Sequence, residues 1–293
     1  MWREYLFPMS VGEALQMLAE HRGRARIIAG GTDLVLQCQA GKVDADVVVD
    51  ITRIPGLDAI EERDDYIHIG AQVTHGRVAA SPLIRERARI LALACATVGG
   101  PQIRNTGTLV GNVVNALPAA DGAVALFALD AEVEAADLNG RRWLPIRELY
   151  RNVGVCLVDP RAEMITGLRF RPLQAHHRCS FQRVAPRRAL SLPILNVAAV
   201  LSVVDGRFQD VRIAMGPVAS LPFRAAGAEA ALLGQVVTDD VIAQAAALAM
   251  QAAQPRDSVL RGSRVYRKAL VQSLVRRALS EAVGLTANGK GGA

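Results

Sequence analysis

Residues 25–51 read ARIIAGGTDLVLQCQAGKVDADVVVDI, and this stretch decides how the chain begins to fold. An apolar run ends at Gly30-Gly31, an apolar segment follows, and a second apolar run spans Val47 to Ile51. The pattern predicts a strand over 26–29, a short helix over 34–40 and a strand over 47–51. Glycine after a strand lets a ligand approach the backbone, and successive N–H groups in such a loop can bind an anion. An ordinary strand-to-helix turn gives the same signal, so this stretch alone leaves both interpretations open.

A second glycine-bearing stretch, residues 99–121, reads GGPQIRNTGTLVGNVVNALPAAD. As a bare loop it would be unusually long, and loops of that length in compact domains are commonly functional. Its amides and hydroxyls suit a polyhydroxylated ligand, and its glycine backbone suits phosphate oxygens. The G-x-G-x-x-G pattern is absent from the sequence, which disfavours a Rossmann dinucleotide site.

Local signals predict the remaining elements. Ser10 and Glu13 have the spacing of a helix-capping box, and Asp205-Gly206 separates two apolar runs as in a two-residue hairpin turn. We place a domain boundary near residues 170–178, between a mixed α/β part and a smaller α+β part. The other expected elements are a helix from Val11 to near Gly23, a strand over 66–70, a helix starting at Ser81-Pro82, a helix over 123–129, strands over 196–204 and 207–215, and helices over 223–233, 239–253 and 263–283.

Composition bounds the class of protein. The 293 residues are 51% hydrophobic and 21% charged, as expected for a globular chain of about two domains. The net charge is +6, but arginines are scattered, and the one dense stretch, 261–277, has the apolar spacing of an amphipathic helix. A solvated helix face or a protein-binding surface is therefore favoured over nucleic-acid binding. No apolar run is long enough to cross a bilayer and no secretory signal is evident, so we expect a cytoplasmic protein without membrane insertion.

The sequence offers no metal site and no catalytic group. The four cysteines lie far apart without C-x-x-C spacing, as expected for buried thiols in a reducing compartment. The adjacent pair His176-His177 would point apart on a strand or a helix. We therefore expect no metal ligands and no catalytic residues in this chain.

The two glycine loops together resemble the paired FAD motifs of one family. Ala29-Gly30-Gly31-Thr32-Asp33-Leu34, Thr108-Leu109-Val110-Gly111-Asn112 and Pro118-Ala119-Ala120-Asp121 are similar to motifs of the medium, flavin-binding subunit of the molybdenum hydroxylases. That family is related to the FAD domain of xanthine dehydrogenase and to carbon monoxide dehydrogenase. Further matches cover essentially the whole chain in order: residues 50–57, 69–74, 102–105, 181–188, 211–217 and 261–267.

The resemblance implies an α+β fold and a division of the chain. A two-subdomain, non-Rossmann FAD-binding domain of the vanillyl-alcohol-oxidase/PCMH type is expected over residues 1–172, with subdomains of about 1–54 and 55–172. A small α+β domain of the carbon monoxide dehydrogenase flavoprotein type, with a β-hairpin sheet and C-terminal helices, is expected over 178–285. Residues 286–293 are expected to form a flexible tail.

The resemblance also implies the residues that bind FAD. Backbone N–H groups of two loops would hold the diphosphate, side chains would hydrogen-bond the cofactor, an apolar residue would pack near the flavin, and a cation would stabilise reduced, anionic flavin. The loop residues are Ile28, Ala29, Gly30, Gly31, Thr32 and Asp33, together with Thr108, Leu109, Val110, Gly111 and Asn112. The backbone of Gly99 and Gly107 would also run close to the cofactor. The hydrogen-bonding side chains are Asn112, Asn115 and Asp121, the apolar residue is Ile165, and the cation is Arg183.

Three positions depart from the family's pattern. Val110 stands where the first glycine of T-x-G-G-N is usual, and its Cβ would narrow the approach to the diphosphate. Ser191-Leu192-Pro193 replaces an acidic residue and the apolar pair after it, and Leu117 stands where a small polar residue is frequent.

The function that the resemblance implies is electron transfer within a complex. Substrate would be hydroxylated at molybdopterin in a large partner subunit, and electrons would pass through [2Fe-2S] clusters of a small ferredoxin-like subunit to FAD in this chain and then to an external acceptor. A dimer of heterotrimers is expected. The alternatives are a self-contained flavoenzyme, oxidase or reductase, of the same superfamily, and a basic nucleic-acid-binding or scaffold protein with vestigial loops.

Overall fold

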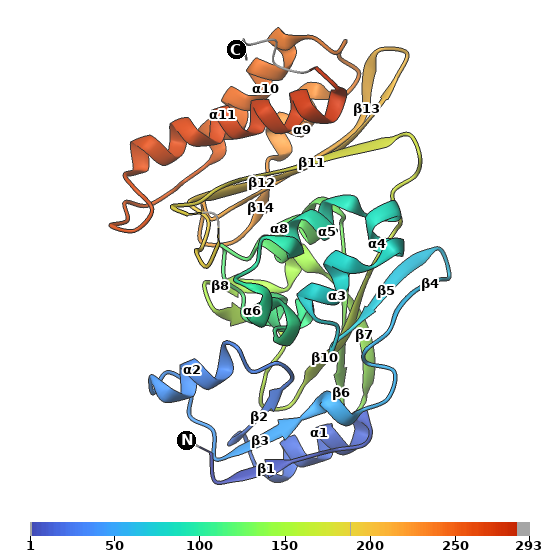
Figure 1. Cartoon of the computed structure of the whole chain (residues 1–293), viewed down its shortest axis with the longest axis vertical. Helices are drawn as coiled ribbons and strands as arrows, with labels where there is room; N and C mark the ends of the chain where they lie inside the picture. The colour runs from blue at the N-terminus through green and yellow to red at the C-terminus, as the bar shows by residue number, and fades with distance from the viewer. Residues whose placement is uncertain (1, 188, 286–293) are drawn as a thin grey trace. The chain divides into compact units, whose positions relative to one another are not determined.

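A computed structural model describes residues 2–187 and 189–285, and the chain forms two compact units. The first unit comprises the chain up to Leu117 together with Asp130–Pro172, and the second comprises Pro118–Leu129 together with the chain from Leu173 onward. Each unit combines helices with antiparallel or parallel sheet (Figure 1). The domain boundaries expected from the sequence stay a prediction.

A three-stranded parallel sheet begins the first unit. Its strands are β1 (Glu4–Leu6), β3 (Val47–Asp50) and β2 (Ala25–Ile28), in the order β1-β3-β2. All four residues of the central strand β3 are buried, as its continuous apolar sequence predicts. Helix α1 (Val11–Glu20) contacts β2 and β3, and helix α2 (Leu34–Gln39) lies between those strands in the chain. The predicted strand–helix–strand unit is therefore confirmed.

The first unit contains a second sheet, which has five antiparallel strands. The chain adds a two-stranded ribbon and two short 3₁₀ helices, η1 (Ile51–Arg53) and η2 (Ile146–Glu148). The sheet order is β4-β5-β10-β6-β7, from β4 (Ile60–Arg63), β5 (Tyr66–Gly70), β10 (Met164–Phe170), β6 (Glu132–Asp137) and β7 (Gly140–Pro145), and the ribbon pairs β8 (Tyr150–Asn152) with β9 (Val155–Cys156).

Five short helices complete the first unit. Two of them show that the stretch 99–121 is not a bare loop, because α6 and α7 occupy most of it. Pro101 stands in the first turn of α6, where the backbone N–H that proline lacks would have no acceptor within the helix. The Thr108 side chain caps α7. The helix predicted to start at Ser81-Pro82 is present. The helices are α3 (His75–Ala80), α4 (Pro82–Arg87), α5 (Arg89–Ala96), α6 (Pro101–Thr106) and α7 (Leu109–Val114).

The second unit is built on a four-stranded antiparallel sheet. Its strands, in spatial order, are β11 (His177–Val184), β12 (Leu195–Val204), β13 (Arg207–Gly216) and β14 (Phe223–Arg224). Asp205 and Gly206 join β12 to β13 with φ values of 49° and 71°. Two consecutive positive φ values are what a two-residue turn of the primed type requires, so the predicted hairpin is confirmed.

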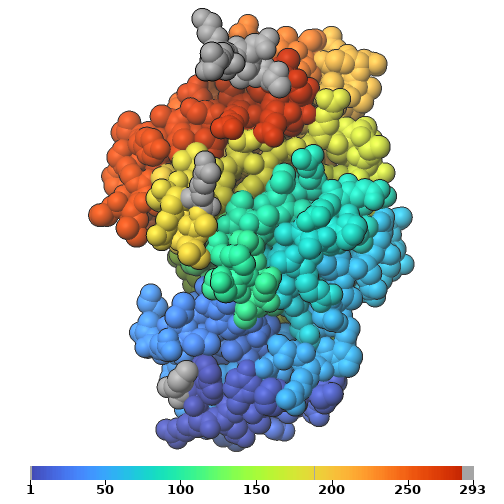
Figure 2. Space-filling model, viewed as in Figure 1, coloured from blue at the N-terminus to red at the C-terminus, as the bar shows by residue number. Residues whose placement is uncertain are grey.

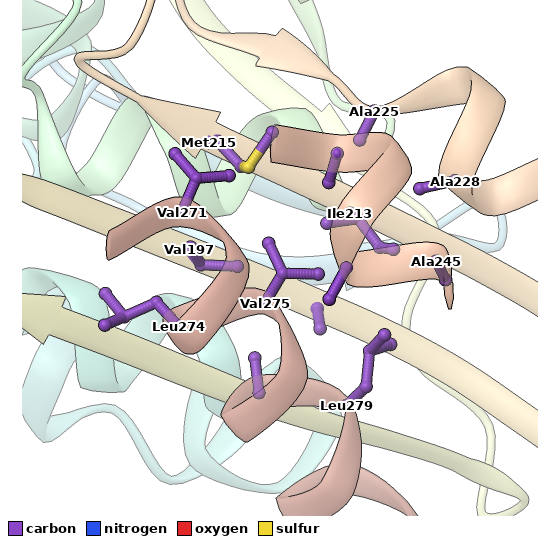
Figure 3. Close-up of a cluster of buried hydrophobic side chains, with 14 of the residues drawn as sticks. Val197, Ile213, Met215, Ala225, Ala228, Ala245, Val271, Leu274, Val275 and Leu279 are labelled. Atoms are coloured by element: carbon purple, nitrogen blue, oxygen red, sulfur yellow. The ribbon is translucent and has the colours of Figure 1, made fainter. Parts of the chain in front are cut away.

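Both faces of this sheet are covered by helices. The first eight residues of β12 are all buried. On one face, helices α9 (Ala226–Leu232), α10 (Asp239–Ala252) and α11 (Arg264–Val283) enclose an apolar cluster in which Val197 and Met215 of the sheet lie beside Val271 and Val275 of α11 (Figure 3). Helix α8 (Asp121–Ala128) contacts β12 and β13.

Two details of the C-terminal sequence differ from expectation. The predicted helix over 223–233 begins with strand β14, because Phe223 and Arg224 pair with Met215 and Ala214 at the sheet edge. The predicted flexible tail, 286–293, lies outside the described residues. Among the helices of residues 2–187 and 189–285, none combines the length and the apolar character needed to span a bilayer.

One arginine of the basic stretch 261–277 is structural. Arg267 is only 4% exposed on the inner face of α11, beside the predicted apolar stripe. Its guanidinium donates hydrogen bonds to the carbonyl of Arg256, at 2.8 Å, and to the carbonyl of Pro217. Buried arginine is tolerated only where its N–H groups find such acceptors. This side chain ties α11 to two loops of the second unit.

A buried histidine lies under the loop that joins α6 to α7. His75 is 2% exposed, its backbone N–H donates to the Gly107 carbonyl at 3.0 Å, and its Nδ1 lies 3.5 Å from Cys95 Sγ. Burial lowers the pKa of His75 to about 4, and the positive charge of Arg104 acts in the same direction. The imidazole is therefore neutral in the folded chain at pH values where an unfolded chain already binds a proton.

We predict that this histidine makes the protein acid-sensitive. The unfolded imidazole protonates near 6.5 and the folded one near 4, so stability is intact above the upper value and falls as the pH drops between them. The loss should reach about 3 kcal/mol across this window. Urea unfolding of wild type and His75→Gln at several pH values measures it. The two pH profiles should diverge by that amount, and parallel profiles would contradict the prediction.

Candidate cofactor site

Two glycine loops of the first unit lie in direct backbone contact. The first glycine loop (Ala29–Asp33) follows β2, and the second glycine loop (Thr106–Asn112) runs from the end of α6 into α7. A Cβ on Gly30 would lie 1.9 Å from the carbonyl oxygen of Thr106 and 2.6 Å from its carbonyl carbon. A Cβ on Gly107 would lie 3.1 Å from Thr32 Oγ1. Gly30 is therefore fixed as glycine by space, and the structure brings the two sequence motifs together.

The first glycine loop offers a run of free donors. Gly31 has a φ of +68°, and a Cβ there would lie 2.9 Å from Ile28 Cδ1. Within the described chain, the backbone N–H groups of residues 30–33 donate to no protein acceptor. Consecutive N–H groups in a turn that includes a left-handed residue form a concavity suited to an anion. This loop can accept phosphate oxygens without first breaking a protein hydrogen bond.

Most backbone N–H groups of the second glycine loop already donate to protein acceptors. The N–H of Gly111 donates to Thr108 Oγ1 at 3.0 Å, the N–H of Asn112 donates to the Thr108 carbonyl at 3.0 Å, and that of Leu109 is also bonded within the chain. A Cβ on Gly111 would lie 2.9 Å from the capping Thr108 Oγ1. In the described chain, the N–H groups of Thr108 and Val110 remain without a protein acceptor. The family resemblance implies donation to the diphosphate from all five residues between Thr108 and Asn112, whereas two of these N–H groups are free within the described residues.

Two side chains of α7 differ in what they offer a ligand. Val110, which departs from the family's glycine, is 4% exposed, so its side chain packs in the protein interior. Asn112 Oδ1 is buried and has no hydrogen-bond partner in the described chain. A buried acceptor without a donor costs about 1–3 kcal/mol, and a ligand hydroxyl or N–H would remove that cost.

A hydrogen-bond network joins the helices that follow the two loops. Gln37 Nε2 on α2 donates to Asn115 Oδ1 at 2.9 Å, and the Asn115 amide lies near the Asp33 carboxylate. Although Asp33 is exposed as a residue, desolvation raises the pKa of its carboxyl group, and the Asn115 hydrogen bond opposes that rise. The sequence pointed to Asn115 and Asp33 but not to Gln37. The sequence feature that could have indicated Gln37 is its position, since it is a polar residue one helical turn after Asp33 within an apolar run.

Gly99 and Ile165 occupy positions with clear structural causes. Gly99 has a φ of +50°, and a Cβ there would lie 2.8 Å from Ile103 Cβ, so the turn before α6 requires glycine. The Arg104 guanidinium secures this turn by donating to the Val98 carbonyl at 3.0 Å. Ile165 is 5% exposed in β10, where the pairing with β6 shifts register, and α7 packs against that strand.

Asp121 and Arg183 lie in the second unit and pair with each other. Arg183 Nε lies 3.1 Å and 3.2 Å from the two Asp121 oxygens, and Asn196 Nδ2 donates to Asp121 Oδ1 at 2.7 Å. Arg183 and Asn196 are directly opposite each other on β11 and β12, and Asp121 opens α8. Arg183 Nη2 also donates to the Ser191 carbonyl at 2.5 Å. The carboxylate thus offsets part of the guanidinium charge.

Within residues 2–187 and 189–285, no group of three or more His, Cys, Asp or Glu side chains is placed to hold a metal ion. The free backbone N–H groups and the unpartnered Asn112 Oδ1 of the described chain suit recognition of an anionic, hydroxyl-bearing ligand.

Family models cover nearly the whole chain. Residues 2–170 match the FAD binding domain in molybdopterin dehydrogenase, and residues 180–282 match the CO dehydrogenase flavoprotein C-terminal domain. These matches confirm the expected fold class and FAD as the cofactor of this chain.

Known proteins match over similar lengths. The nicotine 6-hydroxylase medium subunit of Paenarthrobacter nicotinovorans is 33% identical, covering 95% of this chain and 96% of that protein. The carbon monoxide dehydrogenase medium chain of Hydrogenophaga pseudoflava is 28% identical, covering 95% and 96%. A solved carbon monoxide dehydrogenase from Hydrogenophaga pseudoflava, lacking the Mo-pyranopterin moiety, matches with a TM-score of 0.93 and 29% identity over 98% of this chain and 99% of that chain. The chain therefore belongs to the oxidoreductase family of FAD-binding medium subunits of molybdenum hydroxylases.

Proposed function

We propose that this chain is an electron-transfer subunit that takes electrons from [2Fe-2S] clusters of a small ferredoxin-like partner and passes them to an external acceptor. A large partner with molybdopterin would hydroxylate the substrate. FAD, when bound, supplies the redox chemistry that amino-acid side chains lack. The chain's own residues bind and orient the cofactor. Relatives named as medium subunits or medium chains support this role.

The observation that carries the proposal is the contact between the glycine loops. In this proposal the free N–H groups of residues 30–33, with those of Thr108 and Val110, donate to the FAD diphosphate. The buried Asn112 Oδ1 accepts a hydrogen bond from a cofactor hydroxyl or N–H. These features fit the group, because a diphosphate needs several donors close together and one orphaned acceptor needs a ligand donor.

The other assigned residues have supporting parts in the same proposal. They shape the backbone, pack against the flavin, or hydrogen-bond the cofactor. They are Ile28, Ala29, Gly99, Gly107, Leu109 and Gly111 for the backbone, Ile165 for packing, and Asn115, Asp121 and Arg183 for polar contacts.

The outer face of α11 is the proposed docking surface for a partner subunit. Arg264, Arg276 and Arg277 are exposed on it, and the helix (orange-red) lies at the surface in Figure 2. Arginine is enriched at protein interfaces, where it makes several hydrogen bonds from one side chain. Assembly as a dimer of heterotrimers in the cytoplasm completes the proposal.

Replacing Gly30 by alanine should weaken FAD binding. The new Cβ would meet the Thr106 carbonyl oxygen at 1.9 Å, so the two loops must separate. Forced separation of packed backbone costs about 1–3 kcal/mol, which predicts at least about fivefold weaker FAD binding by titration calorimetry. Gly227→Ala in α9 is the matched control, because a Cβ there has no neighbour within 4 Å. Unchanged FAD affinity in Gly30→Ala would show that the loop contact does not shape the site.

FMN should bind much more weakly than FAD. The free N–H groups of the two loops are assigned to a diphosphate, and FMN carries only one phosphate and no adenosine. We expect an affinity difference of at least about tenfold when both are titrated into the apo chain. Equal affinities would remove the diphosphate assignment of the first glycine loop.

The chain alone should not oxidise an organic substrate. It contains no iron–sulfur motif and no proposed catalytic residue, so bound FAD would lack a source of electrons. Dye reduction should be tested with N-heterocycles and carbon monoxide, using the lone chain and the chain co-expressed with the subunits encoded beside it. Turnover is expected only in the co-expressed complex. Comparable turnover by the lone chain would instead support a self-contained flavoenzyme.

A further inference from the structure

Helix α2, which follows the first glycine loop, has little to hold it in place. It contains six residues, none of them buried, and Leu36 on it is 63% exposed. Helix α2 and the strand β2 that precedes it are labelled in the blue part of the chain in Figure 1. Helices this short are not stable by themselves in water. The position of α2, and of the loop that leads into it, must therefore depend on contacts made by its side chains.

Gln37 supplies such a contact. In the described chain it is the residue of α2 whose side chain hydrogen-bonds outside the helix, through Nε2 to Asn115 Oδ1 at 2.9 Å, across 78 positions of sequence. Asn115 ends α7, where its own backbone N–H donates to the Gly111 carbonyl at 3.0 Å. The bond therefore joins the helix after the first glycine loop to the helix of the second.

Asn115 also lies near the first glycine loop itself. Its amide lies near the carboxylate of Asp33, the last residue of the first glycine loop, and favours the ionised form of that carboxylate, while the backbone N–H of Gln37 donates to the Asp33 carbonyl at 2.9 Å. A side-chain amide has two N–H groups and two lone pairs. Asn115 can thus accept from Gln37 and donate to Asp33 and still retain one N–H for a ligand.

We propose that Gln37 is a positioning residue for FAD: through Asn115 it fixes the first glycine loop against the second, so that the free N–H groups of residues 30–33 face the cofactor. The inference rests on the proposed FAD-binding role of these loops. Gln37 itself contacts no cofactor atom in this account. Its effect arises because the loop binds FAD only while it adopts the binding conformation. If the loop adopts this conformation for only a fraction of the time, the apparent affinity for FAD falls in proportion to that fraction.

The test compares two identical substitutions on one helix. Gln37→Met keeps the length and helix propensity of the side chain but removes its amide. Gln39→Met is the matched control, because Gln39 is exposed on the same helix and its side chain has no hydrogen-bond partner in the described chain. Titration of FAD into the full-length apo chain should show about three- to tenfold weaker binding for Gln37→Met, the range expected for one lost neutral hydrogen bond. Gln39→Met should bind as wild type does.

A double-mutant cycle distinguishes action through Asn115 from a general loss of structure. If Gln37 acts through Asn115, Gln37→Met should cause little further loss of FAD affinity in an Asn115→Ala background. The thermal midpoints of the apo variants should stay close to that of wild type. If Gln37→Met does not fold, Gln37→Ala with Gln39→Ala as its control makes the same comparison.

The outcomes separate this inference from the proposed function. Failure of the wild-type chain to bind FAD would overturn the proposed function. Tight binding by wild type with unchanged binding by Gln37→Met would overturn the positioning role alone. An equal loss in Gln39→Met, or a full loss that persists in the Asn115→Ala background, would overturn it as well.

Discussion

The backbone contact between Gly30 and Thr106 is the constraint on which the site depends. Two segments far apart in the chain can meet this closely only if one of them lacks a Cβ, and a methyl group there would overlap a carbonyl oxygen. The parallel strands β2 and β3 end at this place, and α6 and α7 approach it from the later part of the unit. The loop after β2 supplies the free backbone N–H groups, and Gly30 lets the second glycine loop approach it closely.

The two loops contribute to the site in different ways. The second glycine loop is stiff, because Thr108 caps α7 and most N–H groups nearby already have acceptors. The first glycine loop keeps its N–H groups free but leads into a helix without buried residues. Free donors favour anion binding, whereas unsatisfied, weakly packed backbone favours disorder. The hydrogen bond between Gln37 and Asn115 lies where it can reconcile these needs, since it uses side chains and leaves the loop's backbone donors open.

Local signals in the sequence were sufficient for the strand–helix–strand unit over 25–51 and for the Asp205-Gly206 hairpin, because turn chemistry and apolar runs decide both. They were insufficient for β14, which exists only because the edge of β13 pairs with it. They also missed Gln37, whose partner lies 78 positions away. The glycines of the site were predicted by family resemblance. The reason that Gly30 must be glycine is a contact between distant segments that periodicity cannot reveal.

The arginines show why composition alone misjudges a surface. Arg183 and Arg267 are held inside the second unit, the first by Asp121 and the Ser191 carbonyl, the second by the carbonyls of Arg256 and Pro217. Both contribute to the net charge of +6, yet neither presents its charge to a partner. A nucleic-acid surface would need basic groups gathered and exposed together. Because Arg267 of the basic stretch 261–277 holds α11 in place, the number of arginines in that stretch overstates the charge that its surface presents.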